Sequence, residues 1–434
     1  MRRVLSFLFA LCFLLPLVPR LTSAKPALEN EWALTMPSYM MTGLFNNQIF
    51  AENKTNERHD MGELVYGMVA LVASDMYKKD TEIEIPKLSR PKTLKTTIIA
   101  GEKFTIDDLL RVMLVGSSDE AAFIIASLSD YDVFLKKMND KSAELGMKDT
   151  KFDTVLSIKS IGQYTTVNDM LILYKKLYEI PRVFDMMSEK TFELPETEKA
   201  KARRYRTNCY LFDNYLNTAY YTKSVFAGRT GYIGKEVYNI VAYYEVDGVK
   251  LILVGLGGKR EGNTLSNLKF AKDMGGREFV KDFEAEKIFS ENTILAEYKV
   301  KNAKGTRSVL MVVKDDIKVL APKDYLPLEF EKEVIPLKEN LKAPIAKGEH
   351  LADLRITTDY GEEFAYPLVA DSDIKVSYIL LVINSLYFQC LCGVLVLWVY
   401  WKVCVDIPRK KRRRELELRR LESREWLEKN KHLY

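Results

Sequence analysis

Cysteine is scarce in this chain, which has five cysteines among 434 residues. Cys12 lies in an apolar run near the N-terminus, whereas Cys390, Cys392 and Cys404 lie in or beside a second apolar run near the C-terminus. Cys209 is therefore the only cysteine between the two runs. A single cysteine excludes an intrachain disulfide in that segment, so the fold there must depend on packing.

Histidine is scarcer still, because His59, His350 and His432 are the only three and they lie far apart in the sequence. A histidine-rich zinc site needs several histidines in one place, and a serine triad needs one beside its nucleophile. The scarcity argues against both arrangements, and we expect no metal and no organic cofactor.

An excess of charge is also missing outside one short run. The formal net charge is +5, and the sequence RKKRRR from Arg409 to Arg414 supplies more than all of it. The remainder of the chain is close to neutral, so we expect no nucleic-acid-binding surface on its main body.

Two apolar runs predict how the chain meets a membrane. Two arginines precede the run from Val4 to Val18, and small residues follow it up to Ala24, as in a secretory signal peptide. Val376 to Trp401 contains no charged residue and is long enough to cross a bilayer, and the basic run beyond it should remain in the cytoplasm. The body of the chain should therefore lie outside the cytoplasm, anchored in the cell membrane. The predicted segments are a signal peptide at 1–24, a transmembrane helix at 376–404 and a basic cytoplasmic tail at 405–434.

A hairpin is the central predicted element of the exported part. Val237 to Val246 and Val249 to Gly257 are rich in β-branched and aromatic residues, and Asp247-Gly248 between them is a two-residue turn signal. Arg229-Thr230-Gly231 stands just before this hairpin, where a strand edge could receive an extended peptide through main-chain hydrogen bonds. On the tripeptide alone, a polar turn leading into the strand is the simpler interpretation.

Helical patterns surround the hairpin in the sequence. Leu64 to Met76 is apolar on nearly every side, which predicts a buried helix, with Asp60 as its cap and Glu63 at the capping-box position. A second helix should begin at Thr105 with Asp108 at its capping-box position, and should break at 116–118 before continuing from Asp119. Further helices are predicted at 134–145, 166–178 and 265–283, and Glu193 to Arg206 is expected to be an exposed basic loop.

From Glu284 onward the sequence changes to short alternating segments separated by turns. That spacing predicts a small all-β domain at 284–370. The predicted strands are 294–301, 307–313, 317–320, 329–336, 354–358 and 363–368.

The order of these features, from about residue 25 to residue 370, resembles the D-alanyl-D-alanine carboxypeptidases. These are the low-molecular-mass penicillin-binding proteins of bacterial cell-wall metabolism. The segments that carry the resemblance are Gly116 to Ala122, Leu145 to Phe152, Gly162 to Asp169, Asn208 to Asn214 and Gly228 to Tyr232. It implies an α/β (α+β) transpeptidase-like domain at 25–283, with a central antiparallel sheet flanked by helices, and places the small β domain at 284–370.

The resemblance also implies serine peptidase chemistry, in which a serine is acylated and a lysine one turn later is the base. Ser-x-x-Lys spacing puts the two side chains on one helix face. Here the nucleophile position holds Glu63 and the base position holds Tyr66. A capping role, rather than catalysis, is the preferred explanation for Glu63.

The other two motifs of the family are Ser-x-Asn and Lys-Thr-Gly. Ser117 is retained in the second motif, but Asp119 replaces its asparagine. Arg229 replaces the lysine of the third motif, while Thr230 and Gly231 remain. Arginine can still bind a carboxylate bidentately, but a carboxylate at Asp119 would tend to repel one.

Three other segments match Ser-x-x-Lys and begin at Ser89, Ser266 and Ser372. The first contains a proline, the second lies in a predicted closing helix and the third is next to the membrane. None should lie beside the Arg-Thr-Gly strand, so we expect none of them to be a nucleophile.

Three hypotheses follow. The first is a membrane-anchored pseudoenzyme that binds peptidoglycan stem peptides or acts as a scaffold for other cell-wall enzymes. Its cleft would be filled by the Tyr66 ring and an ion pair between Asp119 and Arg229. The second is an active D-Ala-D-Ala carboxypeptidase or other hydrolase with rearranged groups centred on Ser117, Arg229 and Glu63. The third places function in the tail, where the basic run would bind anionic lipid and 415–431 would bind a partner, although the arginines can simply stop transfer and fix topology.

Overall fold

The computed structural model describes residues 35–429, apart from residues 47, 89–90, 92–93, 95, 216–217, 235, 261–263, 276–282 and 359–362. The predicted signal peptide therefore lies outside the described residues. The chain divides into two compact units, which are described separately below. The first runs to Ser290 and includes Asp316–Glu333 and Leu354–Tyr366, and the second contains Glu291–Asp315, Val334–Asp353 and the chain from Pro367 onward.

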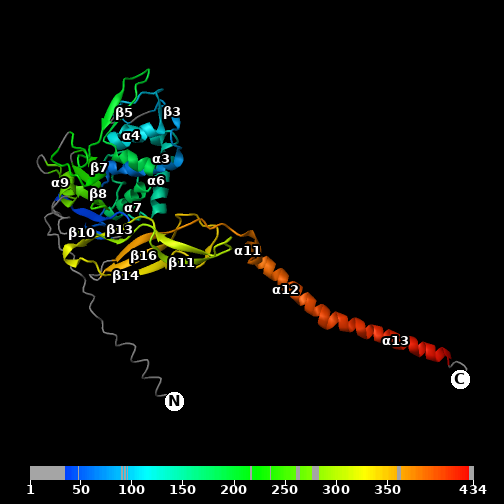
Figure 1. Ribbon diagram of the computed structural model, residues 1–434. Coiled ribbons are helices and arrows are strands. Elements are labelled where there is room, and N and C mark those ends of the chain that lie inside the picture. Colours follow the sequence, from blue (N-terminus) through cyan, green and yellow to red (C-terminus); the bar gives the residue numbers. More distant parts are fainter. Residues whose placement is uncertain are drawn as a thin grey trace, which may run out of the picture. The chain divides into compact units, whose positions relative to one another are not determined.

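A five-stranded antiparallel sheet forms the centre of the first unit (Figure 1). Its order is β2-β1-β9-β8-β7, so β7 is an edge strand. The predicted hairpin is confirmed, and both turn residues, Asp247 and Gly248, have the positive φ angles that the tightest hairpin turns require. The strands are β1 (Ser38–Gly43), β2 (Ile49–Asn53), β7 (Val225–Ile233), β8 (Val237–Val246) and β9 (Val249–Gly258).

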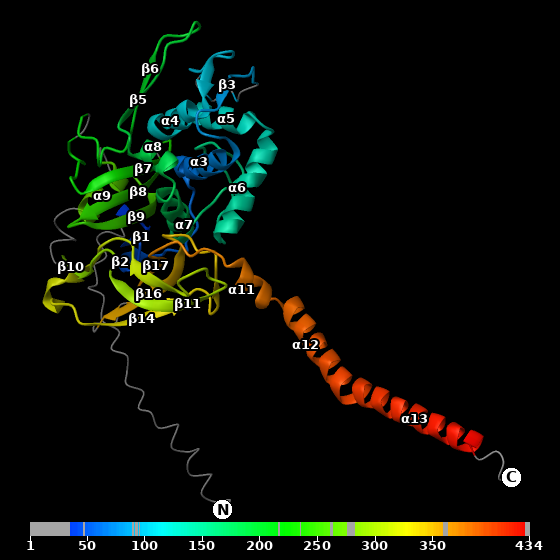
Figure 2. The same cartoon turned by 45° about the vertical axis from the view of Figure 1, so that its right-hand side comes forward.

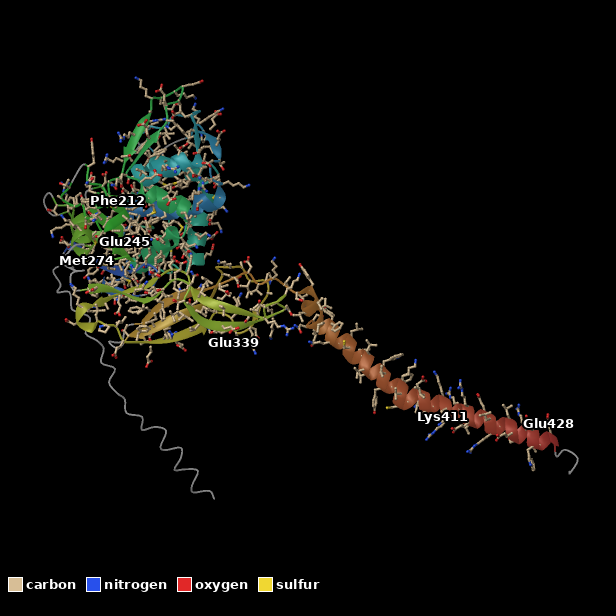
Figure 3. The ribbon with its side chains drawn as sticks, in the orientation of Figure 1. Phe212, Glu245, Met274, Glu339, Lys411 and Glu428 are labelled. Carbon is tan, nitrogen blue, oxygen red and sulfur yellow. The ribbon has the colours of Figure 1, made fainter. Side chains whose placement is uncertain are left out.

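Both faces of this sheet are covered, which explains why its strands are apolar at nearly every position. Along β8, Val241 and Tyr243 pack into one core, while Ile240, Ala242 and Tyr244 pack into another. Successive side chains of a strand point to opposite faces, so a strand buried on both sides loses its polar alternation. Helix α9 (Ser266–Gly275) contributes to the second core, together with Phe212 (Figures 1 and 3).

The first core is built from the remaining helices of the unit, seen from a second side in Figure 2. Helix α3 (Val65–Met76) is its centre, because every residue from Val65 to Ala73 is buried. Each fully buried valine, leucine or methionine contributes roughly 1.5–3 kcal/mol to folding. The others are α4 (Ile106–Gly116), α5 (Asp119–Ser127), α6 (Tyr131–Leu145), α7 (Val167–Tyr178) and α8 (Pro181–Ser188).

The capping prediction at Thr105 is confirmed, and the one at Asp60 is wrong. Thr105 Oγ1 accepts a hydrogen bond from the Asp108 amide at 3.1 Å, and Asp108 accepts one in return at 2.9 Å. The start of α3 is instead a 3₁₀ turn, η2 (Gly62–Leu64), preceded by Met61 with no side-chain cap. Gly62 has a φ of +56° and lies against β7, where a Cβ would be 2.7 Å from the Tyr232 carbonyl oxygen. This close approach directs Glu63 toward the strand rather than back onto the helix terminus.

The predicted exposed loop at 193–206 is wrong in part. Residues 195–202 form a mostly exposed loop, but they connect an antiparallel strand pair, β5 (Thr191–Leu194) and β6 (Arg203–Arg206). Arg203 Nη2 lies 2.8 Å from Glu102, and Arg206 Nε lies 2.6 Å from Asp213. Both carboxylates are buried, and a buried carboxylate is stable only when it is paired and hydrogen-bonded. The arginines are therefore structural partners of buried acids.

From Phe283 to Ala370 the described chain is built almost entirely of strands, as expected. β10 pairs with β13, and a six-stranded sheet has the order β14-β16-β17-β12-β11-β15. The predicted closing helix is too long, because α9 ends at Gly275 and Phe283 already belongs to β10. The strands are β10 (Phe283–Phe289), β11 (Ile294–Lys301), β12 (Ser308–Val313), β13 (Ile317–Pro322), β14 (Phe330–Pro336), β15 (Leu341–Lys342), β16 (His350–Thr358) and β17 (Glu363–Ala370).

The C-terminal apolar run is not one continuous helix. Helix α11 (Tyr378–Ile383) ends before Ser385, whose hydroxyl caps α12 (Leu386–Trp401) by accepting from the Phe388 amide at 3.2 Å. A π-helical turn (Lys402–Asp406) then joins α12 to α13 (Ile407–Lys429). Leu386–Glu428 is the one described helix long and apolar enough to span a membrane, with a mean hydropathy of 1.9 over its best window.

Candidate active site

All three predicted motif positions come together at the β7 edge of the sheet. Glu63 lies in η2 and Tyr66 in the first turn of α3, while Ser117 and Asp119 flank the junction of α4 and α5. The Asn239 side chain helps to hold this arrangement, because it donates to the Asp60 carbonyl oxygen at 2.8 Å from the strand next to β7.

Gly231 allows the helical segment to approach the strand closely. A Cβ at this position would lie 2.7 Å from Leu64 Cγ and 2.9 Å from the Met61 carbonyl oxygen. Both distances are far below normal contact, so a larger residue here would push η2 away from β7. Glycine is thus required for the geometry that brings Glu63 to Thr230.

Glu63 is hydrogen-bonded to the strand side of the site. Its Oε2 accepts from Asn208 Nδ2 at 3.1 Å and lies 3.4 Å from Thr230 Oγ1. The Thr230 hydroxyl donates to Asn208 Oδ1 at 2.5 Å, which closes a small polar cluster. Burial raises the pKa of Glu63 to about 7, against the opposing effects of the Arg229 charge and of hydrogen bonds from Asn208 and Ser117. The capping explanation for this residue is therefore replaced by contacts across the site.

Tyr66 is fully buried, and its hydroxyl donates to Asp119 Oδ1 at 2.7 Å. Burial raises the pKa of this phenol well above its ordinary value, and the negative charge on Asp119 raises it further. A general base must be able to lose its proton near the working pH. Tyr66 is a hydrogen-bond donor to Asp119, and its raised pKa disfavours the deprotonated form that a general base requires.

Asp119 is held by a residue that the sequence did not single out. The Ser157 amide donates to Asp119 Oδ1 at 2.6 Å, and the Ser157 hydroxyl donates to Oδ2 at 2.9 Å. With Tyr66, these bonds give Asp119 three donors. Among the described residues, Asp119 forms no ion pair with Arg229, so one of the two contacts expected to fill the cleft is not formed.

Arg229 is directed into the protein, with only 3% of the residue exposed. Its Nη1 donates to the Leu114 carbonyl oxygen and its Nη2 to Ser117 Oγ at 3.5 Å. The guanidinium lies 5.4 Å from the centre of the Tyr66 ring, a cation–π distance, and Nε is buried without a partner. Bidentate binding of a ligand carboxylate would require Arg229 to leave these contacts.

Ser117 ends α4 in the left-handed conformation, with a φ of 51° and a ψ of 50°. A residue other than glycine adopts this conformation at a cost of roughly 1–2 kcal/mol. The partly exposed Ser117 side chain is held between Arg229 and Glu63. The strained turn thus presents a hydroxyl to the site.

Asn208 and Ser157 are the site residues that sequence reasoning missed. Asn208 lies in a segment that contributed to the family resemblance, but no spacing rule connects it to Thr230 22 residues later. Ser157 lies 38 residues from Asp119. A polar residue in a loop gives no sequence signal of a partner on a distant element, so only folding reveals these contacts.

None of the other Ser-x-x-Lys matches is found at the candidate site among the described residues. Ser266 is buried at the start of α9, and the lysine of its motif, Lys269, lies 2.5 Å from Asp273. Ser89 lies outside the described residues, and Ser372 belongs to the second unit. In the described part of the chain, no group of three or more histidine, cysteine, aspartate or glutamate residues could hold a metal ion.

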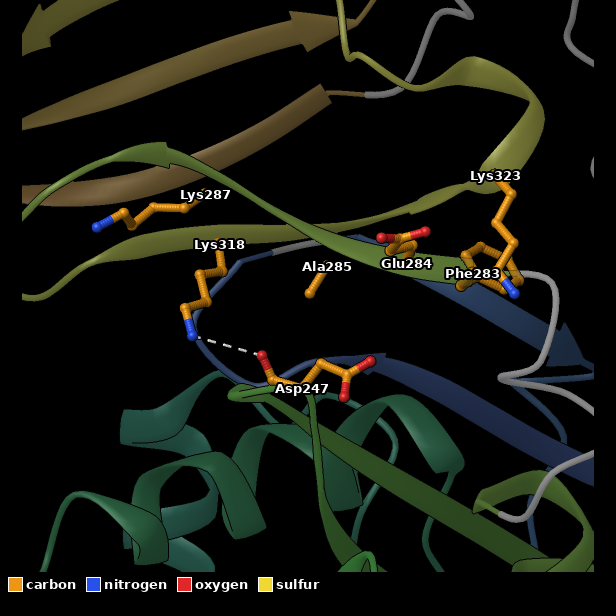
Figure 4. Close-up of a pocket in the computed structure, with 7 residues that line it drawn as sticks. All are labelled: Asp247, Phe283, Glu284, Ala285, Lys287, Lys318 and Lys323. Atoms are coloured by element: carbon orange, nitrogen blue, oxygen red, sulfur yellow. Dashed lines mark hydrogen bonds between the residues drawn. The ribbon is translucent and has the colours of Figure 1, made fainter.

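Two pockets in the first unit lie away from these residues. One, of about 460 Å³, lies between the Asp247 turn and β10, and Figure 4 shows Lys318 directed at the Asp247 carbonyl oxygen, 3.5 Å away. Its lining mixes three lysines with two acids and so offers no single sign of charge. The second, of about 240 Å³, is lined by residues 58–60, 159–161, 163 and 164.

Comparison with known protein families gives matches over most of the chain. The family model described as D-alanyl-D-alanine carboxypeptidase matches residues 24–260. A second model, described as the C-terminal domain of penicillin-binding protein 5, matches residues 283–376. The two matches are consecutive and correspond to the sheet-and-helix part and the strand-rich part of the chain.

Curated relatives with similar sequences are carboxypeptidases. The chain is 27% identical over 282 residues to D-alanyl-D-alanine carboxypeptidase DacF of Bacillus subtilis, covering 63% of this chain and 68% of that protein. It is 25% identical over 237 residues to D-alanyl-D-alanine carboxypeptidase DacA of Escherichia coli, covering 51% and 56%. The chain thus spans from just over half to about two thirds of these relatives' lengths.

Solved structures share the fold at low sequence identity. A peptidoglycan synthesis regulatory factor (PBP3) from Streptococcus pneumoniae has a TM-score of 0.60 at 16% identity, covering 79% of this chain and 99% of that one. Penicillin binding protein 5 from Haemophilus influenzae has a TM-score of 0.55 at 20% identity, covering 79% and 98%. These likenesses concern architecture alone.

Proposed function

Because the chain belongs to the D-alanyl-D-alanine carboxypeptidase family, we propose that it is a non-catalytic member that binds peptidoglycan stem peptides without cleaving them. The observation that carries this proposal is the pair Glu63 and Tyr66 at the nucleophile and base positions. Acyl transfer needs a hydroxyl or thiol nucleophile and a group that removes its proton. Here an acid hydrogen-bonded to Asn208 and a buried phenol that donates to Asp119 replace both groups.

The proposed function includes attachment to the membrane. The apolar segment at 376–404, which includes the first part of the helix Leu386–Glu428, would cross the bilayer, with the carboxypeptidase-like domain outside and the basic segment from Arg409 to Arg414 on the cytoplasmic side. Anchoring would hold the peptide-binding domain near newly exported cell-wall precursors. A role as a scaffold for other cell-wall enzymes is compatible with this arrangement.

One observation supports a second candidate function, an active hydrolase that uses Ser117 as nucleophile. Glu63 hydrogen-bonds to Ser117 and has a pKa of about 7, which is near the optimum for a general base at neutral pH. Against this role, Ser117 also lies 3.5 Å from the Arg229 guanidinium in a strained turn. No lysine accompanies Ser117 in the described site.

Covalent labelling distinguishes the two candidates. Full-length protein in detergent is incubated with a fluorescent penicillin, with an active D-alanyl-D-alanine carboxypeptidase as positive control. We expect no labelled band, no release of D-alanine from a stem pentapeptide, and measurable binding of that pentapeptide. Labelling or D-alanine release that disappears in Ser117→Ala would overturn the non-catalytic proposal and establish the hydrolase.

A further inference from the structure

The acid of the candidate site is more exposed than its cation. Glu63 is partly exposed, whereas Arg229 is only 3% exposed and contacts Ser117. The Arg229 donors are directed at the Leu114 carbonyl oxygen and at Ser117, not at solvent. The Arg229 cation is therefore not exposed to an anionic ligand group that approaches Glu63.

Hydrogen-bond acceptors, rather than donors, are available around Glu63. The Asn208 amide nitrogen is already directed at Glu63, and the Thr230 hydroxyl already donates to Asn208. Thr230 is fully buried, so what the partly exposed groups still offer a ligand is the carboxylate of Glu63 and the lone pairs of Ser117. A carboxylate entering here would also meet the negative charge of Asp119, which is strong enough to raise the pKa of Glu63.

We propose that this site recognises its peptide ligand through a primary ammonium group held by Glu63, rather than through a terminal carboxylate held by Arg229. The inference rests on the proposed function, because it specifies which group of a bound, uncleaved peptide is recognised. An ammonium group has three donors and no acceptor, which complements the carboxylate of Glu63 and the hydroxyl oxygen of Ser117. Charge-assisted hydrogen bonds of this kind are about twice as strong as neutral ones.

The pH dependence of binding follows from the same geometry. Glu63 must be ionised to hold an ammonium group, and its pKa is about 7. Affinity should therefore rise as the pH increases from 6 to 8, while a lysine-type amine with a pKa of about 10.4 stays charged. The charged or titratable groups that act on Glu63 or are acted on by it are Arg229, Asp119, Tyr66, Tyr174 and Tyr232. The phenols among them have raised pKa values and stay neutral in this range.

Three matched tripeptides test the proposal by calorimetry with the full-length protein in detergent. Nα-acetyl-L-lysyl-D-alanyl-D-alanine carries both an amine and a terminal carboxylate. Its Nε-acetylated form lacks the amine, and its C-terminal amide lacks the carboxylate. We expect the amide to bind about as well as the parent peptide and the Nε-acetylated form to bind at least about tenfold more weakly.

Variants locate the effect at Glu63. Glu63→Gln keeps the size and hydrogen bonding of the side chain but removes its charge, so the parent peptide should lose at least about tenfold in affinity and all of its pH dependence. The matched control is Glu245→Gln, at an exposed position of β8 (Figure 3), which should bind like the native protein.

The outcomes separate this inference from the proposed function. Tight binding of the Nε-acetylated peptide and loss of binding by the amide would overturn the ammonium inference, yet leave a non-catalytic peptide binder. Unchanged affinity in Glu63→Gln, or no binding by any of the three peptides, would also overturn it. Cleavage of the parent peptide, in contrast, would refute the proposed function itself, whatever the role of the amine.

Discussion

The two walls of the candidate site differ in what they retain of the family motifs. The strand wall is Arg229 to Gly231 in β7. It has a cation, a hydroxyl and a glycine in the order of the Lys-Thr-Gly motif. The helix wall, formed by Glu63, Tyr66, Ser117 and Asp119, has an acid and a phenol at the positions that we assign to the nucleophile and the base of the first motif. The fold is nevertheless preserved around both walls, because close packing against Gly231 and the hydrogen bond from Asn239 to the Asp60 carbonyl oxygen hold the helical segment in place. Neither contact depends on a serine at position 63 or a lysine at position 66, so the fold tolerates other residues at these two positions.

The largest expected effect is a gain of acylation by penicillin when the residues of the helix wall are changed to those of the family motifs. In Glu63→Ser/Tyr66→Lys/Asp119→Asn, the serine and lysine would lie one turn apart at the start of α3, as acyl transfer requires. We expect a fluorescent penicillin to label this variant and not the native protein. Glu63→Ser alone is the control, and it should stay unlabelled because it lacks a base. If the triple variant folds but is not labelled, Arg229 at the lysine position of the strand wall would also prevent acylation.

The next effect concerns stability and Arg229. Arg229→Ala removes the cation that binds the Leu114 carbonyl oxygen and lies over the Tyr66 ring, leaving buried polar groups unpaired. We expect a loss of about 3 kcal/mol in the free energy of unfolding. Circular dichroism during denaturant titration measures it, with the exposed residue Arg58 changed to alanine as control. A loss no larger than the control's would mean that the guanidinium is free to reach a ligand.

An effect of similar size follows from the raised pKa of Glu63. Its folded-state pKa of about 7 exceeds the unfolded value of about 4.3, so the native protein holds an extra proton between these values. The contribution of Glu63 to stability therefore falls as the pH rises from about 4 to 7. Glu63→Gln should be more stable than the native protein by roughly 3–4 kcal/mol at pH 8 and similar to it at pH 4. Unfolding titrations at the two pH values measure this difference, and an equal effect at both would contradict the raised pKa.

The smallest expected effect tests the hydrogen bond between Tyr66 and Asp119 within the helix wall. Tyr66→Phe removes the hydroxyl that donates to Asp119, while the two bonds from Ser157 remain. We expect a loss of about 1 kcal/mol in the free energy of unfolding. Tyr215→Phe, at a residue whose side chain is 75% exposed, is the matched control and should change little.

Local rules predicted the parts of the fold that depend on neighbouring residues. The hairpin at Asp247-Gly248 follows from two residues with positive φ between apolar strands. The capping box at Thr105 follows from a side chain and an amide three residues apart. The same rule failed at Asp60, because contact with β7 replaced the helical start with a 3₁₀ turn.

The basic segment before β7 shows the same limit. Five cations within 199–206 suggested a solvated loop, but Arg203 and Arg206 pair with the buried acids Glu102 and Asp213. Glu102 lies 101 residues away from its arginine. A sequence pattern reports the charge of a side chain and not the charge that faces it after folding.

For this protein the sequence alone determined most of the order of elements, the hairpin at the centre and the presence of Glu63 and Tyr66 at the positions that the family resemblance assigns to serine and lysine. Those features depend on residue identity and on spacings of a few residues. Tertiary structure decided that Glu63 contacts Asn208 and Thr230, that Asp119 is bound by Ser157, and that Arg229 is directed inward. These contacts join elements far apart in the chain, and their energies depend on burial and on facing charges, which exist only once the chain has folded.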